Sequence, residues 1–214
     1  MKFNDMTIQA FIDDVDSKKP APGGGTVSAL AAQMGVSLIR MVAHLTRGKK
    51  KFKVLDDKVQ DRFNKVFHDF ASYKTEFAKL MDEDTEAFNK IMVAFKLPKD
   101  TDEQKELRKE KISEASEEAI EVPLRIAKLA YRALQYADII MEYGNKHAIS
   151  DIGVGTSMLF SAIESALLNV KINLPGLDDD TTVFHYKKEA DDLLLLARDK
   201  KEAVLKYINQ YLDD

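Results

Sequence analysis

The sequence of 214 residues has no cysteine, and it has only five prolines and nine glycines. Without cysteine the chain can form no disulfide, no thiolate nucleophile and no zinc–cysteine site. The first ten residues are polar and lack the apolar stretch of a signal peptide, so we expect a cytoplasmic protein. The formal net charge is -4, whereas a general nucleic-acid binder is expected to be basic, so we expect no nucleic-acid partner.

Nearly every segment carries a helical period, and no stretch shows the alternation of period two that a half-buried strand needs. We therefore predict an all-α fold, an up-and-down helical bundle with long central helices, in a single domain spanning residues 1–214. Most prolines and glycines fall between the helical runs. Pro123 is the exception, because it lies inside the run from about Thr101 to Tyr143 and is expected to kink or divide that helix.

A glycine-rich junction at residues 20–26, with the sequence PAPGGGT, leads directly into a helical stretch. Glycines can adopt positive φ and have no side chains, so a ligand can approach the backbone closely. The first turn of the following helix also leaves N–H groups without intrahelical partners, which suits an anion or a carbonyl. The alternative is a turn that merely feeds the helix, with Thr26 as its N-cap. The candidate ligand contacts are Gly23, Gly24, Gly25 and Thr26.

The helix predicted over Val27–Thr46 is apolar on nearly all sides and rich in small residues, so it is expected in a core or an interface. Gln33 and Arg40 inside it, and the basic residues just after it, argue against a membrane span. Small side chains allow a second helix to come close. With a similar small-residue helix over Asp151–Asn169, this pattern predicts a homodimer.

An apolar stripe with helical spacing runs from Val59 to Phe95, and its only break is Asp84, at the position between Leu80 and Phe88. A carboxylate rarely occupies a buried position unless it is paired. One interpretation is a buried salt bridge, or a cap at a helix break between Met81 and Thr85. The other is a carboxylate whose pKa is raised by desolvation, suited to general acid–base catalysis near neutral pH.

A third group of polar residues comes late in the chain, at the two ends of the second small-residue helix. Asp151 or Ser150 could be only an N-cap, and Asn169 only a C-terminal residue in the left-handed conformation. Asn173 is harder to explain by capping. The candidate ligand contacts of this group are Asn145, Asp151, Asn169 and Asn173.

The chain resembles the family of formiminotetrahydrofolate cyclodeaminases and methenyltetrahydrofolate cyclohydrolases. The matching motifs keep their order across nearly the whole chain. His44, where asparagine is often expected, and the pair Lys146-His147 depart from the family pattern. The motifs are Pro20-Ala21-Pro22-Gly23-Gly24-Gly25, Met41-Val42-Ala43 with Thr46, Asp84 with Glu86-Ala87-Phe88, Leu97-Pro98-Lys99, Val122-Pro123, Gly144-Asn145 with Ser150-Asp151, and Asn169-Val170 with Ile172-Asn173-Leu174.

The resemblance implies an all-helical homodimer that acts on reduced folates, with its site in a cleft at or near the subunit interface. In cyclodeamination, N10 of 5-formimino-tetrahydrofolate attacks the formimino carbon, the 5,10-methenyl bridge forms and ammonia leaves. Asp84 is the candidate that takes the N10 proton and delivers it to the departing nitrogen. In cyclohydrolysis, the alternative reaction, the same carboxylate would activate water.

The basic run from Arg47 to Lys53, including Lys50, could attract the glutamate tail of a polyglutamylated folate, although most such runs are solvated helix ends. The four histidines are scattered, so we expect no metal, and no cofactor beyond the tetrahydrofolate substrate. A separate formiminotransferase is a possible partner. The alternative of another class is a non-enzymatic helical dimer, a scaffold that would show no stabilisation by reduced folate.

Overall fold

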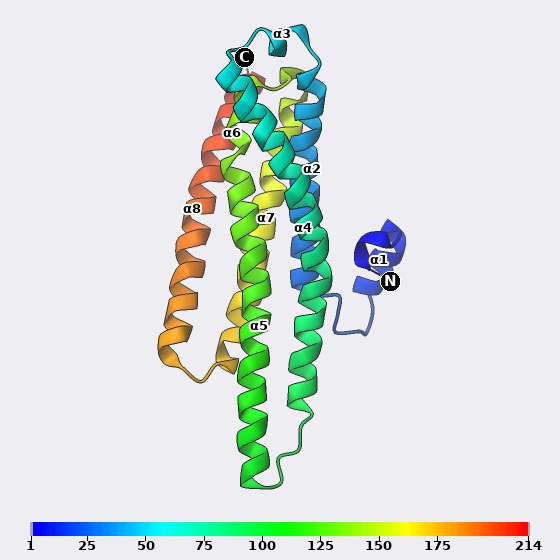
Figure 1. The fold of residues 1–214 in the computed structure, drawn as a ribbon, viewed down its shortest axis with the longest axis vertical. Coiled ribbons are helices and arrows are strands. Elements are labelled where there is room, and N and C mark those ends of the chain that lie inside the picture. The colour runs from blue at the N-terminus through cyan, green and yellow to red at the C-terminus, as the bar shows by residue number, and fades with distance from the viewer. Residues whose placement is uncertain (1, 214) are drawn as a thin grey trace.

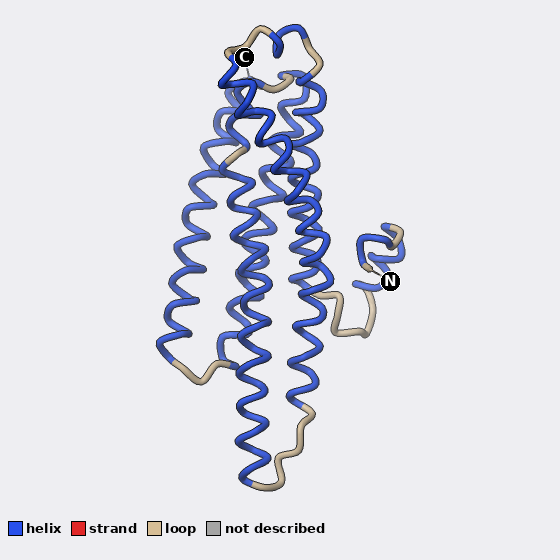
Figure 2. The backbone as a smooth tube through the Cα atoms, viewed as in Figure 1, coloured by secondary structure: helices blue, strands red, loops and turns tan. Residues whose placement is uncertain are grey.

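The computed structural model describes residues 2–213, and within that range it contains helices and loops but no strand (Figure 2). Five long helices run alternately up and down, which confirms the all-α prediction (Figure 1). The remaining helices are short. The helices are η1 (Phe3–Asp5), α1 (Ile8–Val15), α2 (Gly24–Arg47), α3 (Lys50–Lys53), α4 (Asp57–Phe95), α5 (Asp102–Gln135), α6 (Ala137–Tyr143), η2 (Lys146–Ala148), α7 (Ile149–Asn173), η3 (Leu174–Gly176) and α8 (Asp180–Asp213).

Local capping explains where the long helices begin. The Asp56 side chain accepts a hydrogen bond from the backbone N–H of Lys58 at the start of α4, and Thr101 and Gln104 form a capping box at the start of α5. The N-cap of α2 is Gly23, so the alternative in which Thr26 caps this helix is wrong. Thr26 lies inside the first turn because the helix already starts at Gly24.

Two helix breaks, one expected at Pro123 and one considered as an alternative near Asp84, are absent from the described residues. Helix α4 is continuous through Met81 and Thr85, so Asp84 does not cap a break there. Helix α5 passes through Pro123 without interruption and ends at Gln135, so the proline does not divide it. Pro123 is buried, and packing of its neighbours against the core holds the helix together across the missing N–H.

Helix α2 packs mainly against α4 and α7. Gly35 and Gly155 face each other where α2 crosses α7: a Cβ on Gly35 would lie 2.9 Å from the Gly155 carbonyl oxygen. The small residues predicted to allow close helix approach therefore serve packing within one chain. Helices α2 and α7 are long and apolar enough to cross a membrane, but core helices of soluble proteins meet the same criterion.

The stripe on α4 is buried as predicted where it faces the bundle, at Phe63, Phe70 and Phe77 among others. Phe95 is an exception, with half of its surface exposed. The C-terminal end of α4 and the N-terminal end of α5 project beyond the other helices (Figure 1), so only α5 is available to cover Phe95. Arg108 from α5 lies over the Phe95 ring.

Candidate functional site

A cavity of about 220 Å³ lies at the N-terminal end of α2, where this helix meets α4, α5 and α7. Its apolar wall includes Phe88 and Ile172. Its polar wall contains residues from all three sequence motifs that were predicted to contact a ligand. These residues are Gly23, Gly24, Gly25, Asp84, Asn169 and Asn173.

The glycines of this cavity are required for space. No described residue has positive φ, so the expected left-handed glycine conformation does not occur here. A Cβ on Gly25 would overlap the carboxylate of Asp84, and a Cβ on Gly24 would lie 3.1 Å from Nδ2 of Asn169. The helix N-terminus can thus sit directly against these two side chains.

Thr26 holds the carboxylate of Asp84 from the side that faces away from the cavity. Its hydroxyl donates to Oδ2 of Asp84 at 2.9 Å. The Thr85 hydroxyl lies 3.1 Å from the Thr26 hydroxyl and extends the network. Thr26 is completely buried and is absent from the cavity wall, so it supports Asp84 where direct ligand contact had been predicted.

Burial raises the pKa of the Asp84 carboxyl above its ordinary value, and hydrogen bonding from Thr26 opposes that rise. No cation of residues 2–213 contributes to the shift, so the alternative of a buried salt bridge is wrong for the described chain. A half-buried carboxyl without an ion-pair partner, facing a cavity, can exchange a proton with a bound ligand.

Asn169 and Asn173 both lie within α7, so neither has the left-handed conformation considered for Asn169. Nδ2 of Asn169 donates to the Ser165 carbonyl at 2.9 Å. Nδ2 of Asn173 donates to two carbonyls, at 2.9 Å to Asn169 and at 3.0 Å to Ala119. The contact with the Ala119 carbonyl replaces a missing helix hydrogen bond. Ala119 is four residues before Pro123, which has no N–H to donate to that carbonyl.

The other predicted ligand contacts lie at the opposite end of α2. The Asn145 backbone N–H donates to the Thr46 hydroxyl at 2.8 Å, and the Asn145 side chain caps η2. Asp151 is in the first turn of α7, whose N-cap is Ala148, so Asp151 is not itself the N-cap. Lys50 is exposed in α3. A helix of the length of α2 spans about 34 Å, so these residues cannot share one ligand with Asp84 in the same chain.

The side chain of Arg47 is held by contacts within the protein. Its Nε donates to Oδ1 of Asn64 at 2.7 Å, and its guanidinium lies 4.1 Å from the centre of the Phe67 ring. Arg40 lies at the same distance from that ring. The basic run that remains free for an anion is therefore the exposed lysine segment, Lys49, Lys50, Lys51 and Lys53.

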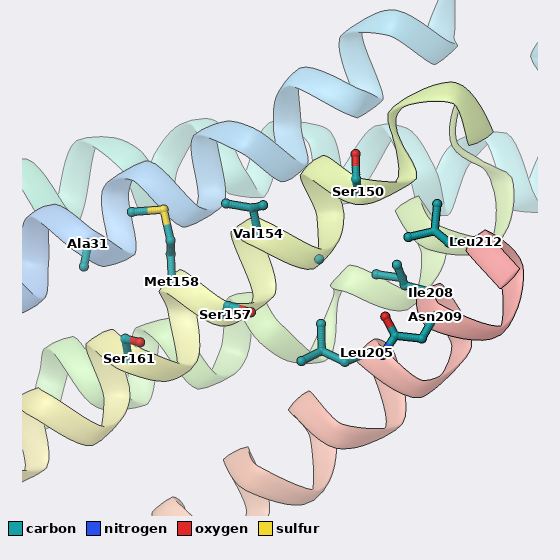
Figure 3. Close-up of a pocket in the computed structure, with 11 residues that line it drawn as sticks. Ala31, Ser150, Val154, Ser157, Met158, Ser161, Leu205, Ile208, Asn209 and Leu212 are labelled. Carbon is teal, nitrogen blue, oxygen red and sulfur yellow. The ribbon is translucent and has the colours of Figure 1, made fainter.

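A second hollow, of about 540 Å³, lies between α7 and α8 (Figure 3). Ser150, Val154 and Ser157 line it from α7, while Leu205 and Ile208 line it from α8. No acidic, basic or histidine side chain lines this hollow. It therefore lacks the acid–base group that the smaller cavity has in Asp84.

Sequence reasoning missed two parts of the site. One is the hydroxyl of Thr85, which follows Asp84 directly in the chain and gave no separate signal. The other is the link from Pro123 through the Ala119 carbonyl to Asn173. A signal for this link was present, because a proline within a helix always leaves the carbonyl four residues earlier without its usual donor.

Comparison with known proteins shows which protein family the chain belongs to. Residues 7–192 match the family model described as formiminotransferase-cyclodeaminase. Methenyltetrahydrofolate cyclohydrolase from Methylorubrum extorquens is 37% identical over 188 residues, which is 88% of each chain. Formimidoyltransferase-cyclodeaminase from Rattus norvegicus is 31% identical over 201 residues, which cover 94% of this chain but 36% of the rat protein.

The fold is similar to a crystal structure of formiminotetrahydrofolate cyclodeaminase from Thermotoga maritima. The TM-score is 0.79, and the match covers 98% of this chain and 97% of that one. The sequence identity is 24%, so this likeness concerns the fold alone.

Proposed function

The chain belongs to the formiminotransferase-cyclodeaminase family, and on that premise we propose that it converts 5-formimino-tetrahydrofolate to 5,10-methenyl-tetrahydrofolate with release of ammonia. The observation that carries the proposal is the carboxyl of Asp84, which faces the cavity without an ion-pair partner. The reaction needs one group that first accepts a proton and then returns it. A carboxyl with a raised pKa serves both steps near neutral pH.

The proposed steps use the residues around the cavity. N10 attacks the carbon of the formimino group, which enters in its protonated amidinium form, so a tetrahedral centre with an NH2 substituent forms, and Asp84 accepts the N10 proton. Asp84 then delivers this proton to the nitrogen that leaves as ammonia, and the methenyl bridge closes. Holding N10 against the formimino carbon contributes as well, because bound reactants react as an intramolecular pair. No metal or further cofactor is needed for these two proton transfers.

The experiment follows both reactions of the family with the purified chain. With 5-formimino-tetrahydrofolate, we expect the absorbance of the 5,10-methenyl product to appear together with ammonia. Loss of that absorbance from supplied methenyl-tetrahydrofolate, without the first reaction, would instead identify a cyclohydrolase, which is the activity named for the relative at 37% identity. Absence of both reactions, and of any rise in melting temperature with reduced folate, would favour a non-enzymatic scaffold.

We further propose that the protein acts as a homodimer. Helix α2 keeps a row of exposed apolar side chains along one face, at Val27, Met34, Met41 and Leu45. Contiguous apolar surface of this kind marks an interaction site. Val27 and Leu45 are equidistant from position 36, and the less exposed Ala31 pairs in the same way with Met41. Such a row is self-complementary for two antiparallel copies of α2 around a two-fold axis.

That arrangement would also account for the residues that lie far from Asp84. Antiparallel pairing sets the C-terminal end of one α2 beside the N-terminal end of the other. The exposed lysine segment that contains Lys50 of the partner subunit would then lie near the glycine-rich junction. Asn145 and Asp151 lie at the same end of α2 as the lysine segment, so those of the partner would also lie near this junction. A folate held beside Asp84 could extend its glutamate tail toward those lysines.

The chain covers 36% of the rat relative, formimidoyltransferase-cyclodeaminase, whose name includes a transferase activity. We propose that a separate formiminotransferase supplies the formimino substrate to this chain in the cytoplasm. Mixing the two proteins tests this: direct transfer predicts methenyl formation that a trap for free 5-formimino-tetrahydrofolate does not reduce.

A further inference from the structure

The side-chain amide of Asn173 has one possible orientation. Its nitrogen lies 3.0 Å from the Ala119 carbonyl oxygen and 2.9 Å from the Asn169 carbonyl oxygen. Carbonyl oxygens only accept hydrogen bonds, so rotating the amide by half a turn would bring oxygen against oxygen. The two N–H groups of Asn173 are therefore both used by the protein, and Oδ1 must point away from these carbonyls.

Pro123 makes one of these contacts possible. An ordinary residue at position 123 would donate its N–H to the Ala119 carbonyl, four residues earlier in α5. Proline has no N–H, so this carbonyl needs another donor, and Nδ2 of Asn173 provides it from α7. A conformational constraint in one helix thus fixes a cavity side chain on another.

The remaining atom of the amide is open to a ligand. Oδ1 of Asn173 has no hydrogen-bond partner among residues 2–213, while Asn173 lines the cavity. The only buried side-chain polar atom without a partner in that range is Oγ1 of Thr156, so Oδ1 of Asn173 is accessible. The cavity therefore presents a pure hydrogen-bond acceptor at this point.

Given the proposed function, we infer that Asn173 determines how the folate is oriented, by accepting a hydrogen bond from the exocyclic 2-amino group of the pterin. This end of a pterin carries N–H donors, whereas the glutamate tail carries carboxylates that Oδ1 would repel. The pterin then lies inside the cavity, with its N5 side toward Asp84, and the tail extends outward.

The size of the cavity agrees with this orientation. Pockets that enclose drug-sized ligands measure roughly 300–1,000 Å³. The cavity has about 220 Å³, so it can hold a fused ring but not a complete folate. Phe88 and Ile172 supply apolar surface for the faces of such a ring.

The first test uses the unmodified protein and two stable ligands, 5-formyl-tetrahydrofolate and the same compound with hydrogen in place of the 2-amino group. Loss of the donor leaves Oδ1 desolvated and unpaired, so the analogue should bind at least about fivefold more weakly by calorimetry. Equal affinities would overturn the inference while leaving the proposed function intact. If neither ligand binds, the proposed function itself fails.

Two variants test the assignment to Asn173. Asn173→Ala should reduce the preference for the 2-amino ligand to near unity, and an unchanged preference in a folded variant would contradict the assignment. Pro123→Ala supplies an N–H to the Ala119 carbonyl and releases the Asn173 amide, so it should weaken the same preference partly and raise KM more than it lowers kcat. A Pro123→Ala variant that loses stability but keeps the full preference would limit Pro123 to a structural role.

Discussion

Gly25 and Asp84 occupy one space. A Cβ on Gly25 would overlap Oδ1 of Asp84 and lie 2.7 Å from Oδ2, so a carboxylate at position 84 requires glycine at position 25. The first turn of α2 and the middle of α4 are thereby in direct contact. This contact places an N-terminal helix turn beside the acidic group and shields one side of the carboxylate from water.

Gly25→Ala should therefore displace Asp84. We expect kcat/KM to fall about 100-fold or more, as for the loss of a positioned acid–base group, and the protein to lose about 1–3 kcal/mol of unfolding free energy through overpacking. The control is Gly48→Ala at the other end of α2, where a Cβ meets nothing within 4 Å. Gly48 has φ of -84°, so alanine there should leave activity unchanged and stability equal or higher. Equal activities of the two variants would refute this contact's role.

Asp84→Asn keeps the shape of the side chain but cannot transfer a proton. We expect kcat to fall about 100-fold or more, with dimer formation and folate affinity retained. Asp82→Asn is the matched control, since Asp82 only accepts a hydrogen bond from the Phe3 N–H through Oδ1, which asparagine keeps. A folded Asp84→Asn protein with normal kcat would show that Asp84 is structural.

The pH dependence of stability should also distinguish Asp84→Asn from the wild type. The pKa of Asp84 is raised in the folded chain, so the native state holds this proton more tightly than the unfolded state. Its contribution to stability is therefore present below the unfolded pKa, about 3.9, and is lost as pH rises through the folded pKa. Asp84→Asn should match or exceed the wild type in unfolding free energy at neutral pH, as measured by urea titration.

Thr26 is expected to set the working pH range of Asp84. Its hydroxyl lowers the pKa of the carboxyl against the effect of burial, so Thr26→Val should raise this pKa and move the acidic limb of the kcat profile to higher pH. Thr26→Ser retains the donor and should keep the wild-type limb. If both variants shift the limb equally, the hydroxyl is not the cause.

Helix positions and the presence of Asp84 in an apolar stripe followed from residue spacing alone, because burial of one helix face requires that spacing. Residue spacing did not predict which candidate residues lie close together in the folded chain. The Asp84 cavity depends on the antiparallel packing of α2 and α7, which brings Gly24 to Asn169. The same packing carries Asn145 away from Asp84. The role of Thr26 was also not predictable, since a hydroxyl near a helix start is equally typical of a cap.

The apolar row on α2 predicts the effect of a charge on assembly. Met34 is 49% exposed, and Met34→Glu should yield a folded monomer at micromolar concentration, because two copies of the new carboxylate would lie close to the two-fold axis. Met92→Glu is the control, since Met92 is exposed on α4, outside this row. Sedimentation velocity separates the outcomes. A wild-type protein that is already monomeric would rule out the proposed dimer.

The exposed lysine segment provides the last prediction. Replacing Lys49, Lys50 and Lys51 together by Gln should weaken a polyglutamylated folate more than its monoglutamate, and should reduce the salt dependence of binding, because only the longer tail reaches these charges. The preference for the longer glutamate tail should depend on the dimer, because the lysines near the cavity come from the partner subunit. In the Met34→Glu monomer the same lysines are about 34 Å from the cavity along α2, so the preference for the longer tail should already be absent, and the triple substitution should change nothing further. Equal losses for both ligands in the dimeric triple variant would reject the role of these lysines in tail binding.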